Sequence, residues 1–188
     1  MSGPAALGTA REALRLLARH APAAYGVALL ATAVNTVPDV LRQVLVWDDP
    51  RYPAALAVDV VGFLTGLVAQ LWVTGALAAL PAGGRPERGG ALRRGSGLAW
   101  TAVRTAPGTV LTGVVFGGTV SALLTLPPSI AALGLTRVVG PLDDPGVGAF
   151  AVAAISDVVA SAVTLPFLAL VVVLAAGRHR LTPAAVGQ

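Results

Sequence analysis

The residues in this sequence best suited to chemistry are two carboxyl groups inside long apolar segments. Asp59 and Asp157 each stand in a run of otherwise uncharged residues. Apolar surroundings favour the protonated form of a carboxyl group, which lets such a group act as an acid or base. Each shares a helical face with small or polar residues at intervals of three or four: Gly62, Gly66 and Gln70 after Asp59, and Ser161 and Thr164 after Asp157.

We group these carboxyls with other polar residues of the same segments into one predicted polar cluster. Its members are Asn35, Asp39, Arg42, Asp59, Gln70, Arg137 and Asp157. We expect Arg42 or Arg137 to pair with one of the two carboxyls, because a charge at the centre of a span costs about 2.5–3.5 kcal/mol. The cluster is then either a polar site open to the outside or a set of ion pairs that fixes helix register. We favour ion pairs, since the positions do not lie clearly at the midplane.

Common catalytic and metal-binding patterns are missing from the sequence. There is no cysteine, no Glu-x-x-His pattern and no Gly-x-Ser-x-Gly elbow. The glycine-rich segment 83–90 lacks the Gly-Lys-Ser/Thr ending of a phosphate-binding loop and is interpreted as a linker. Residues 95–97, Gly-Ser-Gly, are expected to form a flexible loop. We therefore expect no catalytic residue, no metal site and no cofactor.

The elements that must position the polar cluster are membrane-spanning helices. The 188 residues are 55% hydrophobic and 12% charged, and residues 60–84 and 105–136 carry no formal charge. A bilayer core takes about 20 apolar residues as a helix, with every backbone polar group bonded internally. We predict an all-α, polytopic membrane helix bundle with spans at about 22–46, 54–80, 107–132 and 148–176. Pro38, Pro127-Pro128 and Pro166 interrupt these runs and are expected as kinks or broken helix ends. An alternative for the third run is that it stops near Leu126 and continues as a separate outer segment.

Arginine placement predicts the orientation in the membrane. The N-terminal segment, the central loop and the C-terminal tail hold three, five and two of the 13 basic residues, all arginines. Cytoplasmic segments carry an excess of basic residues. We expect a multi-pass protein of the cell membrane with both termini, the loop 81–106 and the tail 178–188 in the cytoplasm.

Two amphipathic helices are expected to lie in the membrane interface. Residues 5–20 place Leu7, Leu14 and Leu17 on one side and three arginines on another, and residues 91–105 carry a second basic face with a tryptophan. Such helices can bind anionic headgroups. For residues 5–20 the alternative is a short solvated helix leading into the first span. The predicted headgroup contacts are Arg11, Arg15, Arg19, Arg93, Trp100 and Arg104.

The chain also shows a short internal repeat within one membrane domain of residues 1–188. Arg-x-Ala-Pro at 19–22 and 104–107, Thr-x-Pro at 36–38 and 125–127, and Asp-Val-Val at 59–61 and 157–159 recur in the same order. We expect parallel half-repeats at about 5–80 and 91–177. Glycine pairs at helical spacing are expected to form helix-packing contacts: Gly62 with Gly66, and Gly113 with Gly117.

The layout resembles the glycerophosphoryl diester phosphodiesterase membrane-domain-like proteins of bacteria. The features that carry the resemblance are the basic helix 11–22, the glycine-rich basic segment 83–107, and Thr125-Leu126-Pro127-Pro128. The resemblance covers most of the chain and implies a membrane-embedded accessory or transport-related role. It implies no particular functional residue.

Two classes of function follow from these observations. The first is a non-enzymatic integral membrane protein, either an accessory subunit or a small transporter component. The second is a small membrane enzyme acting on a lipid or isoprenoid, with Asp59 or Asp157 as acid or base. A dry, ion-paired carboxyl favours the first, and an unpaired carboxyl in a lipid-accessible pocket favours the second. Expected partners are membrane lipids, including anionic ones, and a second copy or another membrane protein, but not nucleic acid.

Overall fold

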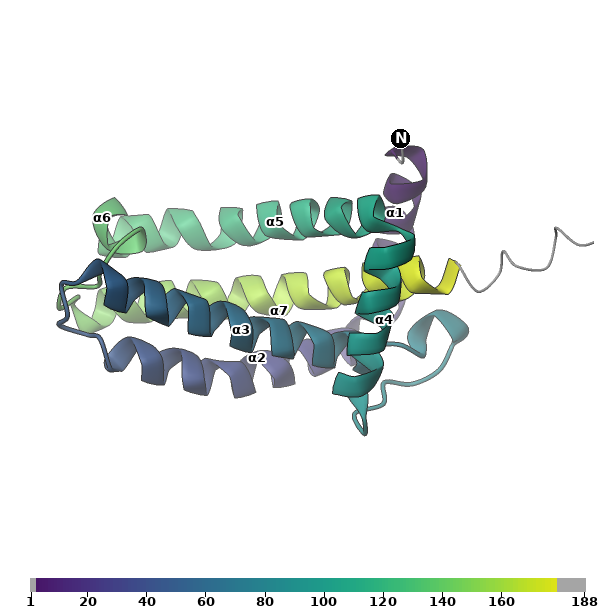
Figure 1. The fold of residues 1–188 in the computed structure, drawn as a ribbon, viewed down its shortest axis with the longest axis horizontal. Helices are drawn as coiled ribbons and strands as arrows, with labels where there is room; N and C mark the ends of the chain where they lie inside the picture. Colours follow the sequence, from purple (N-terminus) through teal and green to yellow (C-terminus); the bar gives the residue numbers. More distant parts are fainter. Residues whose placement is uncertain (1–2, 179–188) are drawn as a thin grey trace, which may run out of the picture.

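The computed structural model describes residues 3–178 and is all-α over that range (Figure 1). The predicted tail 179–188 lies outside the described residues. The elements are α1 (Gly3–Arg19), α2 (Ala21–Val44), α3 (Tyr52–Ala76), the 3-10 turn η1 (Leu80–Ala82), α4 (Ala91–Thr105), α5 (Pro107–Leu133), α6 (Leu135–Val138) and α7 (Val147–Arg178).

Four of these helices are long and apolar enough to cross a membrane. They are α2, α3, α5 and α7, with 24, 25, 27 and 32 residues. Large apolar side chains such as Phe63, Leu111 and Leu123 cover their outer surfaces, as contact with lipid requires. The chain is therefore a polytopic membrane helix bundle, and the four predicted spans are confirmed within a few residues.

The internal prolines do not end the spans. Pro38 lies inside α2, Pro127 and Pro128 inside α5, and Pro166 inside α7. The predicted third span of 107–132 is confirmed and the alternative break near Leu126 is not found, because α5 continues to Leu133 and stops at Gly134. Gly134 has a φ of 84°, which a residue with a side chain rarely adopts. A helix is retained through proline in a span because unbonded backbone is costly there.

The helices α1 and α4 lie across one end of the bundle, nearly perpendicular to the spans (Figure 1). The loops 45–51 and 139–146 lie at the opposite end. We call these the arginine-rich end and the loop end. Both halves therefore have the same order, a transverse amphipathic helix followed by two antiparallel spans. The fold class agrees with the predicted bundle of four spans and two amphipathic helices.

Small residues form the faces by which the transverse helices contact the bundle. On α1 the buried residues are Ala6, Thr9, Ala10, Ala13 and Leu17, and on α4 they are Ala91, Gly95 and Ala102. The expected grouping of Leu7 and Leu14 with Leu17 is wrong. Leu17 is buried, whereas Leu7 and Leu14 are each 55% exposed, because the helical period puts them at the edge of the buried face.

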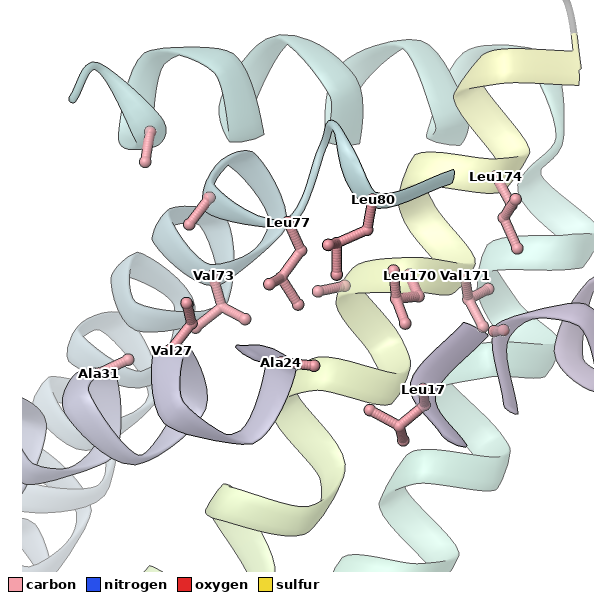
Figure 2. Packing of buried hydrophobic residues seen from close by; sticks show 14 residues of the cluster. Leu17, Ala24, Val27, Ala31, Val73, Leu77, Leu80, Leu170, Val171 and Leu174 are labelled. Carbon is pink, nitrogen blue, oxygen red and sulfur yellow. The ribbon is translucent and has the colours of Figure 1, made fainter. Parts of the chain in front are cut away.

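The apolar core is concentrated at the arginine-rich end. Figure 2 shows its side chains converging from α1, α2, α7 and the end of α3, with Leu77 and Leu80 just beyond α3. The buried residues of α2 lie between Ala24 and Thr32, in its first half. The helix α7 is central and contacts α1, α2, α3, α4 and α5. The bundle is thus tightly packed at one end and more loosely packed at the other.

The helices α3 and α4 cross with their backbones in contact. A Cβ built at Gly75 would collide with the Ala91 carbonyl oxygen, and one at Gly95 with the Leu71 carbonyl oxygen. Residues 95–97 lie inside α4 and are helical, which corrects the expected flexible loop. Close approach of two backbones requires residues without a side chain.

The predicted glycine pairs have different surroundings. A Cβ at Gly113 would lie 2.8 Å from Val171 Cγ1, and one at Gly117 would lie 4.0 Å from the Phe167 ring, so this pair faces α7. Gly62 faces the Arg42 guanidinium group instead of another backbone. Gly66 has open space around it in the structure.

Candidate functional site

A polar cavity of about 300 Å³ lies at the loop end of the bundle. It is formed by α2, α3, α5, α6 and α7 together with the loop that precedes α7. Five members of the predicted polar cluster line it: Asp39, Arg42, Asp59, Arg137 and Asp157. The remaining two members lie elsewhere, because Asn35 faces an apolar groove and Gln70 contacts the middle of α7.

The ion pair in this cavity joins Arg42 to Asp39, three residues earlier on the same helix. We expected Arg42 or Arg137 to pair with Asp59 or Asp157, and the structure differs. The Arg42 guanidinium group extends across to α3 and occupies the space that Gly62 leaves free. Its Nε and Nη1 atoms are buried without a hydrogen-bond partner. Arg42 is thus bound on one side only and keeps two donors for a further acceptor.

The carboxyl groups of Asp59 and Asp157 reach the cavity without an ion-pair partner among the described residues. Both side chains are accessible to solvent in the isolated chain. Asp39 and Arg42 are close enough to act electrostatically on Asp157. The cavity is therefore lined by charges of both signs.

Hydrogen bonds between the two outer loops lie beside the cavity at the loop end. The Trp47 indole N–H donates to an Asp144 carboxyl oxygen over 2.9 Å, and the Asp144 backbone N–H donates to the Trp47 carbonyl over 2.9 Å. The Trp47 ring also meets Phe150 edge to face, with centroids 5.0 Å apart. Arg137 donates to the Asp143 carbonyl over 3.0 Å. The two bonds between Trp47 and Asp144 tie the loop after α2 to the loop before α7.

A second ion pair lies in the loop after α2. Arg51 makes bidentate hydrogen bonds to the Asp49 carboxylate, with Nη2 2.6 Å from Oδ2. The side-chain hydrogen bonds from Arg51 lower the pKa of Asp49 to about 2. Arg51 therefore holds Asp49 as a carboxylate, and the rim of the cavity keeps a fixed ion pair.

Polar side chains also connect the spans, both at the cavity and closer to the arginine-rich end. Gln70 Nε2 donates to the Leu165 carbonyl over 3.3 Å and so links α3 to α7. The hydroxyls of Ser129 and Ser156 are 3.3 Å apart and link α5 to α7. Hydrogen bonds between spans hold helices together where water is absent.

The transverse helices expose the predicted headgroup contacts. Arg11, Arg15 and Arg19 are exposed along α1, and Arg93, Trp100 and Arg104 are exposed along α4. The Arg104 guanidinium carbon lies 4.1 Å from the Trp100 ring centroid, in cation–π range. Exposed apolar residues lie beside each basic face, as in a helix at the membrane interface: Leu7 and Leu14 on α1, and Leu92 and Val103 on α4. Contact of these residues with lipid stays a prediction.

Several residues around the cavity were not predicted from the sequence. Thr125 and Ser129 line it from α5, and their spacing of four residues on one span is a signal that identifies such a face. Trp47, in the loop after α2, contacts Asp144, which is 97 residues later in the loop before α7, and Phe150 in the first turn of α7. No local pattern in the sequence indicates these contacts.

Together, the fold and the cavity define a four-span membrane protein with a polar pocket at one end and a packed core at the other. No cluster of three or more histidine, cysteine or acidic side chains that could hold a metal lies within residues 3–178. No protein-family model, characterised protein or solved structure gives a significant match to this chain. The family resemblance noted in the sequence stays an expectation.

Proposed function

We propose that this chain is a non-enzymatic integral membrane protein. Of the two roles within this class, we favour a small transporter component over an accessory subunit. The observation that carries the proposal is the cavity of about 300 Å³ at the loop end. The cavity would receive a small cation from outside the cell.

The contrast between the two ends of the bundle supports a cavity that opens to one side only. The arginine-rich end is closed by α1, by α4 and by the apolar core around Leu77 and Leu170. The loop end is hollow and lined by charged side chains. A bundle with one closed and one hollow end has the geometry of a binding site that faces a single side of the membrane.

The charge of the lining favours a cation. Four carboxyl groups and two guanidinium groups line the cavity, and Arg42 is already engaged by Asp39. The carboxyls of Asp59 and Asp157 have no such partner among residues 3–178. Walls of low dielectric constant strengthen the field of unpaired charges and concentrate ions of opposite sign.

The direction in which the cavity opens rests on the arginine distribution. The helix α1, the linker before α4 and α4 itself hold eight of the 13 arginines and lie at the arginine-rich end, and an excess of basic residues favours the cytoplasmic side for that end. The loop end and its cavity then face the outside of the cell membrane, and both termini are cytoplasmic.

A second candidate function is a membrane enzyme that acts on a lipid or isoprenoid. One observation favours it, namely that Asp59 and Asp157 are unpaired and reach a cavity. An acid or base needs a substrate atom within hydrogen-bond reach. Polar side chains that line the cavity and could orient such a substrate are Thr125, Ser129 and Arg137.

Cysteine labelling in intact cells tests the proposal, because the chain has no cysteine of its own. Ala154 lines the cavity, and its neighbour Ile155 is 64% exposed on the outer surface of the same helix. In Ala154→Cys, a membrane-impermeant methanethiosulfonate with a trimethylammonium group should react from outside the cell. Ile155→Cys, at the same depth but facing lipid, should stay unlabelled. Equal labelling of the two variants would refute the proposed cavity.

The charge preference is tested with a sulfonate reagent of similar size. The trimethylammonium reagent should react faster with Ala154→Cys, and tetramethylammonium chloride should slow that reaction. Removing one charge roughly 8 Å away at an effective dielectric constant of about 40 is worth about 1 kcal/mol, so Asp157→Asn should slow the trimethylammonium reaction about fivefold. A faster sulfonate reaction would contradict cation binding. If phospholipid vesicles, and not tetramethylammonium, slow the labelling of Ala154→Cys, the result would favour the membrane enzyme.

A further inference from the structure

A second hollow, an apolar groove of about 620 Å³, runs between α2 and α3. Leu30 and Val34 of α2 face Leu64 and Val68 of α3 across it, and Leu92 of α4 closes its end at the arginine-rich side. Within the described chain, no residue of α5 or α7 lines this groove. It shares no lining residue with the polar cavity. The groove is therefore on the lipid-facing surface of the bundle.

An amide side chain lies in this apolar groove. Asn35 lines it and has no side-chain hydrogen bond to any residue described by the structure. Asn35 is nine residues before Val44, the last residue of α2, which places it about 13 Å along the helix from the loop end. A hydrocarbon core about 30 Å thick includes that depth. Lipid chains offer an amide neither donor nor acceptor, so Asn35 lacks a partner in the isolated bundle.

Pro38 adds an acceptor to the same surface. Proline has no N–H, so the carbonyl of Val34, four residues earlier, loses its usual helical donor. Val34 is 66% exposed and lines the groove. Carbonyls freed by proline in spans are satisfied by neighbouring helices. The groove thus presents an amide and a freed carbonyl one residue apart in an otherwise apolar surface.

We infer that this groove is the interface with a second copy of the chain, related by a twofold axis close to Asn35. An amide both donates and accepts, so Asn35 of one copy can bond Asn35 or the Val34 carbonyl of the other, and the reverse. A twofold contact brings the same patch of each copy together and satisfies both copies at once. The cavities stay open in such a dimer, because they are lined by other residues.

Disulfide crosslinking of the full chain in lipid vesicles tests the interface. Val34→Cys keeps Asn35 and should form a disulfide dimer under mild oxidation, at a yield that stays high when the chain is diluted with lipid. Leu123→Cys is the matched control. Leu123 is 68% exposed on α5, lies ten residues before the last residue of that helix, Leu133, and is followed four residues later by Pro127, so its position on α5 matches that of Val34 on α2. Equal crosslinking of the two variants would overturn the inference.

The role of the amide is tested in the Val34→Cys background. Asn35→Leu should weaken dimerisation about tenfold, which corresponds to about 1.4 kcal/mol, and Asn35→Gln should restore most of it. Energy transfer between labelled copies in vesicles of decreasing protein-to-lipid ratio gives the dissociation constant. Far-UV circular dichroism and melting of each variant show that the fold is intact. An unchanged dimer in Asn35→Leu, or a monomeric native chain that carries a bound lipid, would refute the dimer interface.

Discussion

Replacing Gly95 with alanine should separate α3 from α4. The added methyl group would collide with the Leu71 carbonyl oxygen and lie 2.9 Å from the Gly75 nitrogen. Both atoms belong to the backbone of α3, so no side-chain rotamer can relieve the contact. The helix α4 would have to move away from α3 and lose its buried face.

The size of the effect follows from two opposing contributions. Overpacking of a close contact costs typically 1–3 kcal/mol, and a collision with backbone belongs at the upper end, at about 3 kcal/mol. Alanine is a better helix former than glycine by about 1 kcal/mol. Gly95→Ala should therefore lower the free energy of unfolding by about 2 kcal/mol.

Gly97 provides the matched control two residues further along the same helix. A Cβ at Gly97 meets nothing within 4 Å, so Gly97→Ala should keep only the gain of about 1 kcal/mol in helix propensity. The two variants should then differ by about 3 kcal/mol. Reversible unfolding of the detergent-solubilised chain by dodecyl sulfate, followed by circular dichroism, measures this difference. Equal stability of the two variants would refute the backbone crossing of α3 and α4.

Three further predictions concern segments outside the spans. Arg94→Met should cost about 1–3 kcal/mol, because its guanidinium group bonds backbone carbonyls of the linker before α4, and faster proteolysis of that linker should accompany the loss. Asp144→Ala should cost about 1 kcal/mol and red-shift the fluorescence of Trp47, whose indole loses its acceptor. The Asp49 carboxyl should titrate near pH 2 by NMR, and in Arg51→Gln its midpoint should rise toward 3.8. Because the folded pKa of Asp49 is depressed, the stabilisation by this pair is present above about pH 4 and is lost as the pH falls through about 2.

Neighbouring residues serve as controls for these variants. Arg93→Met removes an exposed arginine next to Arg94 and should leave the linker resistant to protease. Asp143→Ala removes the carboxyl group of the adjacent residue, whose backbone φ is also positive, and leaves the contact of Trp47 with Asp144 in place. An effect of either control as large as that of its neighbour would contradict the assigned hydrogen bonds.

The spans could be predicted from sequence because a bilayer imposes one local rule. A segment without charge that crosses hydrocarbon has to be helical, so the charge-free residues 60–84 and 105–136 indicate α3 and α5. The existence of the two amphipathic helices was equally predictable, but the residues of α1 that pack on the bundle were not, since Leu7 and Leu14 lie at the edge of the buried face. At Pro127-Pro128 the sequence left open a break near Leu126, and the predicted span of 107–132 is the alternative that α5 matches.

The candidate site could be predicted only as a set of residues. Five members of the predicted cluster line one cavity, because polar residues on spans turn away from lipid. Their pairing could not be derived, since Asp39, Asp59 and Asp157 all stood within plausible reach of Arg42. The pair that forms is the one already three residues apart on one helix, with Gly62 leaving room for the guanidinium group. Contacts such as Gly75 with Gly95 depend on how two helices cross, which no local pattern specifies.

The bond between Trp47 and Asp144 sets an order on the biogenesis of the protein. Trp47 leaves the ribosome 97 residues ahead of Asp144, so the first pair of spans enters the membrane long before its partner loop exists. The wall of the cavity is incomplete until α7 has been synthesised and inserted beside α2 and α3, because Phe150, Ala153, Ala154 and Asp157 of α7 line it. A chain that stops after α5 would therefore present the translocation machinery with a half-assembled bundle whose charged residues lack their enclosure. The bundle and its cavity are therefore complete only once the last span is in place.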